Sequence, residues 1–204
     1  MRTNLFSFME VGARLRLALR MEKDKLDVMI NRRSIRLQGY DYSRIGAYFV
    51  TVCTYHRLCL FGEIIDGRMA LNDAGRIVEQ CLNEISRHFP HVELDEFIVM
   101  PNHVHGIVVI ANRRGTACRA PTTEQFGRPV TGSMPTIIRS FKSAATKRID
   151  ELRNTPGAAI WQRNYYEHVI RNDDELNRIR EYIANNPAQW AIDRENPAIV
   201  AARQ

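Results

Sequence analysis

The sequence lacks the features of a membrane-spanning protein and of a structural zinc site. No apolar run approaches the roughly 18 residues that a membrane-spanning helix needs. Its 4 cysteines include no CxxC pair, which argues against a zinc site built from thiolates. Near the start, Glu10, Arg14 and Arg16 interrupt the apolar stretch of a secretory signal. We therefore expect a cytoplasmic protein with free thiols and no membrane partner.

Acidic residues are the smaller share of the charge. The chain of 204 residues has 29 lysines and arginines against 23 aspartates and glutamates, which gives a formal net charge of +6. An excess of basic side chains favours a polyanionic partner, with nucleic acid as the first candidate, and we expect an association with the nucleoid. A basic protein without such a partner is the alternative that composition leaves open.

Internal repeats and low-complexity segments are also absent, and the chain divides into three parts. Residues 1–38 form a basic N-terminal extension, residues 39–190 one domain, and residues 191–204 a tail. The extension is either an arm on a phosphate backbone or a lead-in without a role. A polar loop over residues 111–133 interrupts the domain, and loops of that length are usually functional or disordered.

Turn and capping signals predict the elements of the domain. Asp66-Gly67 indicates a hairpin over residues 60–71, and Asn72 can cap a helix that ends near Phe89. Asn172 or Asp173 can cap a last helix that Pro187 stops. The other expected elements are strands over 47–56, 92–100 and 103–110, a basic helix over 134–154 and a strand-like segment over 159–171.

This order predicts an α+β fold. Without the inserted hairpin, the first part reads β-α-β-β-α-β, which is the ferredoxin-like arrangement. We expect one antiparallel sheet with helices packed on one face, followed by a C-terminal helix that docks on the sheet.

Two histidines stand inside one of the most apolar runs, VMPNHVHGIVVI. Because side chains of a strand alternate between its faces, His103 and His105 point the same way and can share a metal ion. The alternative is a pair of polar residues satisfied by their neighbours at a strand end. Two ligands are also incomplete, since a catalytic divalent ion needs at least a third protein group.

The last helix offers that third group. Tyr182 and Asn186 are four residues apart, so they share one helix face beside the apolar stripe of Leu176, Ile179 and Ile183. An amide oxygen is an acceptable ligand for Mg²⁺ or Mn²⁺, and a tyrosine hydroxyl can attack a phosphorus atom. A tyrosine at this spacing is also compatible with ordinary packing.

Three segments together resemble a known family. RRSIRLQGYDYSRIGAYFVTVCTYHR, PNHVHGIVVI and WQRNYYEHVIRNDDELNRIREYIANNP are similar to the REP-associated tyrosine transposases, from about residue 32 to residue 190. This family is related to the single-strand insertion-sequence transposases within the HUH endonucleases (histidine, bulky hydrophobic residue, histidine).

The resemblance implies a site and a reaction. His103 and His105 match the pair that binds a divalent ion, Mg²⁺ or Mn²⁺, Tyr182 matches the catalytic tyrosine, and Asn186 matches a polar position that completes the metal site. The enzymes of this family cleave single-stranded DNA beside hairpins of REP type, form a 5′-phosphotyrosine link and can rejoin strands. The insertion-sequence relatives act as homodimers, whereas REP-associated members can be monomeric, and we favour a monomer.

Other residues could take part. Tyr165 and Tyr166 are alternative nucleophiles, and Glu96 could approach the metal from a neighbouring strand. His168 could contact DNA or support the site, or simply be hydrogen-bonded within its strand. The residues that we predict to contact DNA are Arg32, Arg33, Arg36, Arg113, Arg114, Arg139, Lys142, Lys147, Arg148 and His168.

The leading interpretation is a metal-dependent, single-strand-specific DNA endonuclease and strand transferase. A DNA-binding protein that kept the fold and hairpin recognition without catalysis is the alternative from another class. A metallohydrolase of small phosphoesters is a third interpretation, but it would need more carboxylates near the histidines and would leave the basic residues unexplained.

Overall fold

The structure is a computed structural model, and it describes residues 40–111, 130–193 and 195–201. The predicted N-terminal extension and most of the polar loop over 111–133 lie outside these residues. The same holds for part of the predicted DNA-binding set, namely Arg32, Arg33, Arg36, Arg113 and Arg114.

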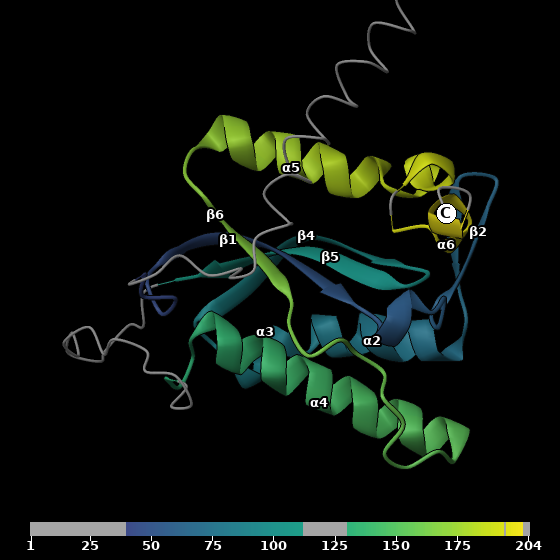
Figure 1. Cartoon of the computed structure of the whole chain (residues 1–204). Helices are drawn as coiled ribbons and strands as arrows, with labels where there is room; N and C mark the ends of the chain where they lie inside the picture. Colours follow the sequence, from purple (N-terminus) through teal and green to yellow (C-terminus); the bar gives the residue numbers. More distant parts are fainter. Residues whose placement is uncertain (1–39, 112–129, 194, 202–204) are drawn as a thin grey trace, which may run out of the picture. The chain divides into compact units, whose positions relative to one another are not determined.

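One four-stranded antiparallel sheet forms the centre of the described fold (Figure 1). Its strand order is β4-β5-β1-β6, so β5 and β1 are the inner strands and each is paired on both edges. This is the order expected of the predicted β-α-β-β-α-β arrangement, and the α+β, ferredoxin-like prediction is confirmed. The strands are β1 (Gly46–Cys53), β4 (Val92–Met100), β5 (His103–Ile110) and β6 (Tyr166–Ile170).

The inserted hairpin is also present as β2 (Gly62–Ile65) and β3 (Arg68–Leu71). Asp66 and Gly67 join its strands, with φ angles of 49° and 73°. Positive φ at both central residues is the requirement of the tight hairpin turn that the Asp-Gly pair predicts.

The helix predicted over residues 73–89 is divided in two. Asn72 caps α2 (Asp73–Asn83) by accepting a hydrogen bond from the Gly75 amide at 2.9 Å. After Glu84, a single further turn forms α3 (Ile85–His88). The basic helix predicted over 134–154 is α4 (Met134–Arg153).

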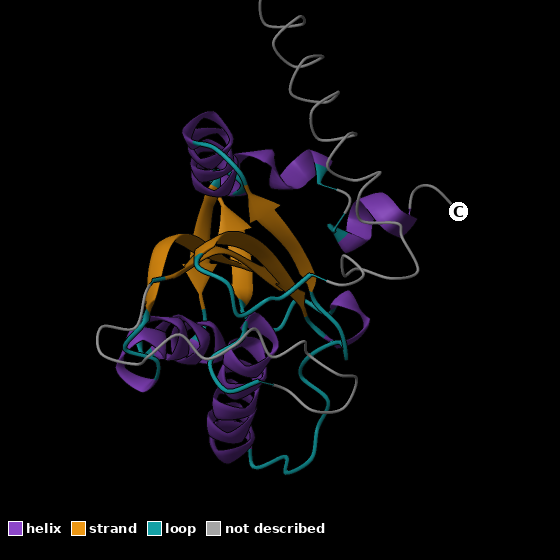
Figure 2. Ribbon diagram, turned by 90° about the vertical axis from the view of Figure 1, so that its left-hand side faces the viewer, coloured by secondary structure: helices purple, strands orange, loops and turns teal. Residues whose placement is uncertain are grey.

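The helices of the ferredoxin-like unit lie on one face of the sheet, as predicted, and the C-terminal helix docks on the other face. Figure 1 shows α2, α3 and α4 on one side and α5 (Asp173–Asn185) on the other, and Figure 2 shows the sheet between them. The larger core lies under α2 and α4, where Val50 and Val104 meet Phe141. A smaller apolar layer that includes Phe49 and Ile183 lies on the α5 side.

Both faces need cover because β5 is apolar on both. Ile107 and Val108 are neighbours on this strand and therefore point to opposite faces, yet both are buried. α5 supplies Ile179 and Ile183, which are 5% and 0% exposed, to the face that α2 and α4 leave open. The position of α5 follows from this second apolar face.

Three segments differ from the expected boundaries. The strand predicted over 47–56 ends at Cys53, and a 3₁₀ turn, η1 (Tyr55–Arg57), follows it. Only the end of the segment 159–171 is the strand β6, although Trp161 makes an isolated bridge with Thr54. Past the predicted stop, Pro187 begins a second 3₁₀ helix, η2 (Pro187–Ile192), and α6 (Pro197–Ala201) follows.

Among the residues that the structure describes, no helix is both long enough and apolar enough to cross a membrane.

Candidate active site

The two histidines are buried side by side at the start of an inner strand. His103 is 0% exposed and His105 is 4% exposed, and their ring centroids are 4.4 Å apart. Val104 lies between them and faces the larger core on the other side of the sheet. The alternation expected of a strand therefore brings both imidazoles to the face that α5 covers.

Each histidine ring is held at its Nδ1 atom. His103 Nδ1 lies 2.8 Å from the Asn102 side-chain oxygen, and His105 Nδ1 lies 2.8 Å from the Thr51 hydroxyl. Thr51 is the direct partner of His105 across the β1–β5 pair. Histidines that bind metals usually engage one ring nitrogen in this way, which leaves Nε2 as the nitrogen that can bind the ion.

Tyr182 extends from α5 to this pair. Its hydroxyl oxygen is 3.3 Å from His105 Nε2, and the two ring centroids are 5.2 Å apart. Phe49 packs against both rings, with its centroid 5.4 Å from that of His105 and 6.1 Å from that of Tyr182. The aromatic contacts fix the tyrosine at the edge of the histidine pair.

Asn186 occupies the C-cap of α5, one turn beyond Tyr182. It is 1% exposed, and neither atom of its side-chain amide has a hydrogen-bond partner among the residues that the structure describes. Four residues further on, the Trp190 ring centroid lies 6.1 Å from that of His103. Tyr182 thus contacts His105, and Trp190 lies near His103. Asn186 lies between Tyr182 and Trp190 in the sequence.

A divalent ion fits this set of donors. Imidazole nitrogen is a common ligand of divalent transition-metal ions and amide oxygen suits Mg²⁺ or Mn²⁺, and a buried amide without a partner costs free energy unless a ligand satisfies it. Within the described ranges, no group of three or more His, Cys, Asp or Glu side chains is placed to hold a metal. An ion bound by His103, His105 and Asn186 would therefore draw its remaining ligands from water or from substrate oxygens.

Cys53 lies opposite His103 across the strand pair but is no thiolate. Burial, reinforced by the Glu195 carboxylate, raises the pKa of this thiol to about 12. Cys53 therefore stays protonated near neutral pH and does not add an anionic ligand. Cys59 and Cys81 are free thiols as well, whereas Cys118 lies outside the described residues.

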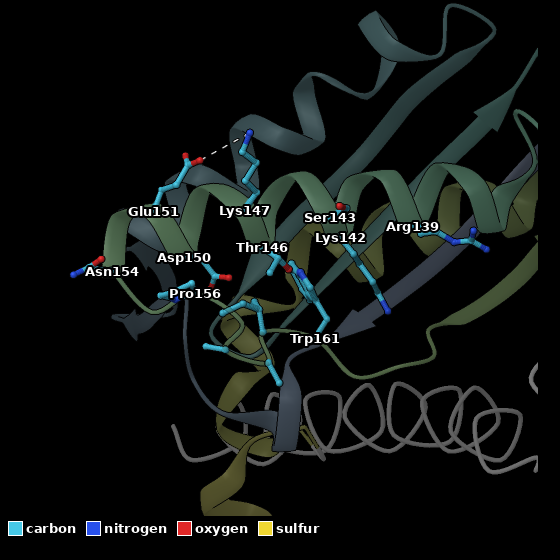
Figure 3. Close-up of a pocket in the computed structure, with 13 residues that line it drawn as sticks. Arg139, Lys142, Ser143, Thr146, Lys147, Asp150, Glu151, Asn154, Pro156 and Trp161 are labelled. Atoms are coloured by element: carbon cyan, nitrogen blue, oxygen red, sulfur yellow. Dashed lines mark ion pairs between the residues drawn. The ribbon is translucent and has the colours of Figure 1, made fainter.

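The basic residues of α4 lie on the other side of the sheet from the histidines. Arg139, Lys142 and Lys147 line an open cavity of about 840 Å³ between α4 and the segment that ends at Trp161 (Figure 3). Arg139 and Lys147 are exposed to solvent there, although Lys147 lies 4.0 Å from the Glu151 carboxylate. These two side chains are available to an anionic partner.

Lys142 and Arg148 have structural partners. The Lys142 ammonium donates to the carbonyls of Gln162 and Asn164 at 2.9 and 3.0 Å and lies 3.5 Å from a third, and its burial lowers its pKa to about 8. Arg148 donates through both terminal nitrogens to Glu84, at 3.3 and 2.6 Å. Their predicted DNA contacts remain predictions, but each already holds α4 to a neighbouring segment.

His168 and the alternative nucleophiles take other positions. His168 Nε2 lies 2.8 Å from the Glu175 carboxylate, where β6 meets α5. Tyr166 packs on Phe49 at 6.2 Å between ring centroids, and burial raises the pKa of its hydroxyl. Tyr165 lies near the Lys142 ammonium instead, 5.8 Å from its ring centroid.

Asn102, Thr51 and Trp190 are site residues that the sequence patterns did not single out. Thr51 meets His105 only through the register of two strands that are far apart in sequence. Asn102 immediately precedes the histidines, but it reads equally well as part of the Pro-Asn turn. The adjacency of Asn102 to His103 was the one local signal that could have identified it.

No family model matches the sequence. Over 168 residues the chain is 42% identical to an uncharacterized protein of Haemophilus influenzae, and the match covers 80% of this chain and 92% of that protein. A second Haemophilus influenzae protein, named "Putative REP-associated tyrosine transposase", is 26% identical over 151 residues, which is 73% of this chain and 74% of that protein.

Two solved structures are also similar. One is a REP-associated tyrosine transposase bound to a REP hairpin, with a TM-score of 0.48, 19% identity, and coverage of 78% of this chain and 74% of that chain. The other is described as "a putative transposase" from Deinococcus radiodurans R1, with a TM-score of 0.42, 17% identity, and coverage of 74% of this chain and 97% of that chain.

Proposed function

We propose that this chain cleaves and rejoins single-stranded DNA beside hairpins. The premise is that it belongs to one family with the 42%-identical Haemophilus influenzae protein and is a relative of the REP-associated tyrosine transposases. The observation that carries the proposal is the contact between the Tyr182 hydroxyl and His105 Nε2, at 3.3 Å. It supports the proposal because the proposed nucleophile lies against one imidazole of the buried histidine pair.

In the proposed reaction, Tyr182 is the nucleophile. Its hydroxyl gives up a proton as its oxygen attacks a backbone phosphorus. The bond from phosphorus to the 3′ oxygen breaks, and that oxygen takes up a proton and leaves as a 3′-hydroxyl. The strand stays attached to the protein through a 5′-phosphotyrosine bond. Because the number of phosphoester bonds is unchanged, a 3′-hydroxyl can reverse the step and rejoin the strands without an external energy source.

Residues around the tyrosine supply position and charge. His103, His105 and Asn186 would hold Mg²⁺ or Mn²⁺, which neutralises charge on the phosphate oxygens when bound. The packing of Phe49 on both His105 and Tyr182 keeps the hydroxyl close to the place where the phosphate would bind. Positioning and charge neutralisation together are what phosphoryl transfer requires.

The DNA partner follows from the relatives and from the basic residues. The name of one curated relative refers to REP sequences, and this chain carries a formal net charge of +6. We propose that single-stranded hairpins of REP type bind with backbone contacts from exposed basic side chains such as Arg139 and Lys147. A monomer that acts with its own Tyr182 is the simplest arrangement, because Tyr182 and His105 meet within one chain.

Covalent trapping tests the proposal. Purified protein is incubated with labelled hairpins from the repeats of its own genome, with Mg²⁺, with Mn²⁺ or with a chelator, and is run on a denaturing gel. We expect a metal-dependent protein–DNA band that Tyr182→Phe and His103→Ala abolish, and that Tyr166→Phe, the matched tyrosine control, retains. Tight binding of folded wild-type protein to these hairpins without any such band would favour the non-catalytic DNA-binding function.

A further inference from the structure

Asn102 is fully buried, and its side chain makes three hydrogen bonds. Its Oδ1 atom lies 2.8 Å from His103 Nδ1. Its Nδ2 atom donates to the Arg57 carbonyl at 3.1 Å and to the Glu195 carbonyl at 2.6 Å. One amide therefore joins a predicted metal ligand to two segments that are distant in sequence.

These contacts determine the orientation of the amide. A backbone carbonyl can only accept a hydrogen bond, so the atom facing the Arg57 and Glu195 carbonyls must be the amide nitrogen. The atom facing His103 is then the amide oxygen, which also can only accept. It follows that His103 carries its proton on Nδ1, and that in the neutral ring Nε2 carries the lone pair.

The two carbonyls are themselves held in place. His56 and Arg57 both have left-handed backbone conformations, with φ angles of 51° and 57°, which are uncommon for residues other than glycine. The Arg57 guanidinium forms an ion pair with the Glu195 carboxylate. The Asn102 backbone is fixed as well, because its carbonyl accepts from the Thr54 amide at 2.9 Å and from the Thr54 hydroxyl at 3.0 Å.

We propose that Asn102 is a positioning residue that fixes the tautomer and the orientation of the His103 ring. It keeps the proton on Nδ1 and thereby presents Nε2 as a ligand atom. The consequence for a divalent ion rests on the proposed function, since it takes His103 as a metal ligand. The tautomer itself does not, and it can be measured in the metal-free protein.

The first test is the ring protonation of His103 by long-range ¹H–¹⁵N correlation spectroscopy without metal. We expect the Nδ1–H tautomer in the wild type and in Asn102→Asp, whose carboxylate also accepts. In Asn102→Ala we expect a shift toward the Nε2–H tautomer, which neutral imidazole prefers in water. An Nε2–H ring in the wild type, or an unchanged Nδ1–H ring in a folded Asn102→Ala, would overturn the proposal.

The second test is Mn²⁺ affinity by titration calorimetry. Loss of a residue that orients a metal-binding histidine typically weakens metal binding by about 10- to 100-fold, and we expect Asn102→Ala to fall in that range. Thr136→Val is the matched control, because it removes a hydroxyl that donates to the Val130 carbonyl at the start of α4, on the other side of the sheet from the histidines. We expect a lower melting temperature for this control and nearly unchanged Mn²⁺ affinity.

The two tests separate the inference from the proposed function. If the wild type binds no Mn²⁺ but His103 shows the Asn102-dependent tautomer, the metal site of the proposed function fails and the positioning role of Asn102 stands. If Mn²⁺ binds with equal affinity to the wild type and to folded Asn102→Ala, the positioning role fails and the metal site stands.

Discussion

Asn186 presents a conflict between stability and binding within one residue. Its amide is buried, and among the residues in the described part of the chain it has no hydrogen-bond partner. Leaving such a group unsatisfied costs about 1–3 kcal/mol, whereas an apolar group of similar shape avoids that cost. This cost is the basis of a test of the proposed metal site.

We therefore predict that Asn186→Leu weakens Mn²⁺ binding by at least tenfold while it leaves the melting temperature unchanged or raises it. Asn185→Leu, at an exposed position of the same helix end, should leave Mn²⁺ affinity unchanged. Thermal unfolding and titration calorimetry give the two quantities. A variant of Asn186 that unfolds earlier yet binds Mn²⁺ normally would identify the amide as structural.

Residue spacing alone predicted part of this site. His103 and His105 share a face because they are two apart on a strand, and Tyr182 and Asn186 share a face because they are four apart on a helix. Spacing did not provide Thr51, because its contact with His105 depends on strand register. It also did not provide Arg57 and Glu195, whose carbonyls accept from Asn102 across 45 and 93 residues of sequence.

At the scale of an element, the start of α5 depends on one carboxylate. The Glu175 carboxylate accepts a hydrogen bond from the Arg171 amide at 2.8 Å and lies 2.8 Å from His168 Nε2. Asn172 caps the helix by accepting from the Glu175 amide. Burial acts to raise the pKa of Glu175, but the Arg171 and His168 hydrogen bonds outweigh it and lower the pKa below its ordinary value.

The sign of this shift gives a pH prediction. A carboxyl whose pKa is lower in the folded state stabilises the protein above its ordinary pKa, and this stabilisation is lost as pH falls through the lowered value. Glu175→Gln should therefore destabilise the protein at neutral pH and lose less free energy of unfolding than the wild type between about pH 5 and pH 3. Urea unfolding at a series of pH values measures this.

Glu181→Gln, which removes an exposed acid from the same helix, is the control for the change in net charge. If the free energy of unfolding falls equally with decreasing pH in Glu175→Gln and in the wild type, the contacts of Glu175 add nothing to the stability of α5.

The elements themselves were largely predictable, and the failures have local causes. Caps at Asn72 and Asn172 and the Asp66-Gly67 turn carry their signals within a few residues, and all three are present. The early end of β1 was not predictable, because His56 and Arg57 adopt positive φ without being glycine. The docking of α5 on the sheet was predicted from its apolar stripe, whereas which face it covers was not, because an apolar strand does not reveal which helix covers which side.

At the scale of the whole molecule, the basic α4 surface formed by Arg139 and Lys147 and the histidine pair lie on opposite sides of one sheet. α4 carries Arg139 and Lys147, whereas α5 covers the histidines (Figure 1). A DNA strand that contacts both α4 and the histidine pair must pass around the edge of the sheet. The α4 contacts would therefore add affinity without touching the reacting phosphate. This division predicts variants that separate binding from cleavage.

We predict that the double variant Arg139→Gln, Lys147→Gln binds hairpin DNA more weakly and with a smaller salt dependence. Each phosphate contact contributes about 0.7 to the slope of log K against log salt for single strands, so the slope should fall by about 1.4 in magnitude. At saturating DNA, the yield of covalent product should be unchanged. Fluorescence anisotropy at several salt concentrations measures the slope.

Arg68→Gln, an exposed arginine on the β2–β3 hairpin, serves as the matched single-charge control and should leave the slope as in the wild type. An unchanged slope in the double variant would remove the α4 surface from the DNA interface.

The inner position of β5 has a consequence for local opening. The histidines belong to a strand that is paired on both edges, and their backbone amides can exchange with solvent only when the sheet itself opens. Tyr182 belongs to a helix that lies across one face and buries mainly Ile179 and Ile183 there. We therefore expect the amides of α5 to exchange with solvent at a smaller opening free energy than those of β5, so that Tyr182 can separate from the histidines while the imidazoles remain in register. The histidine pair would then stay assembled while Tyr182 is away from it.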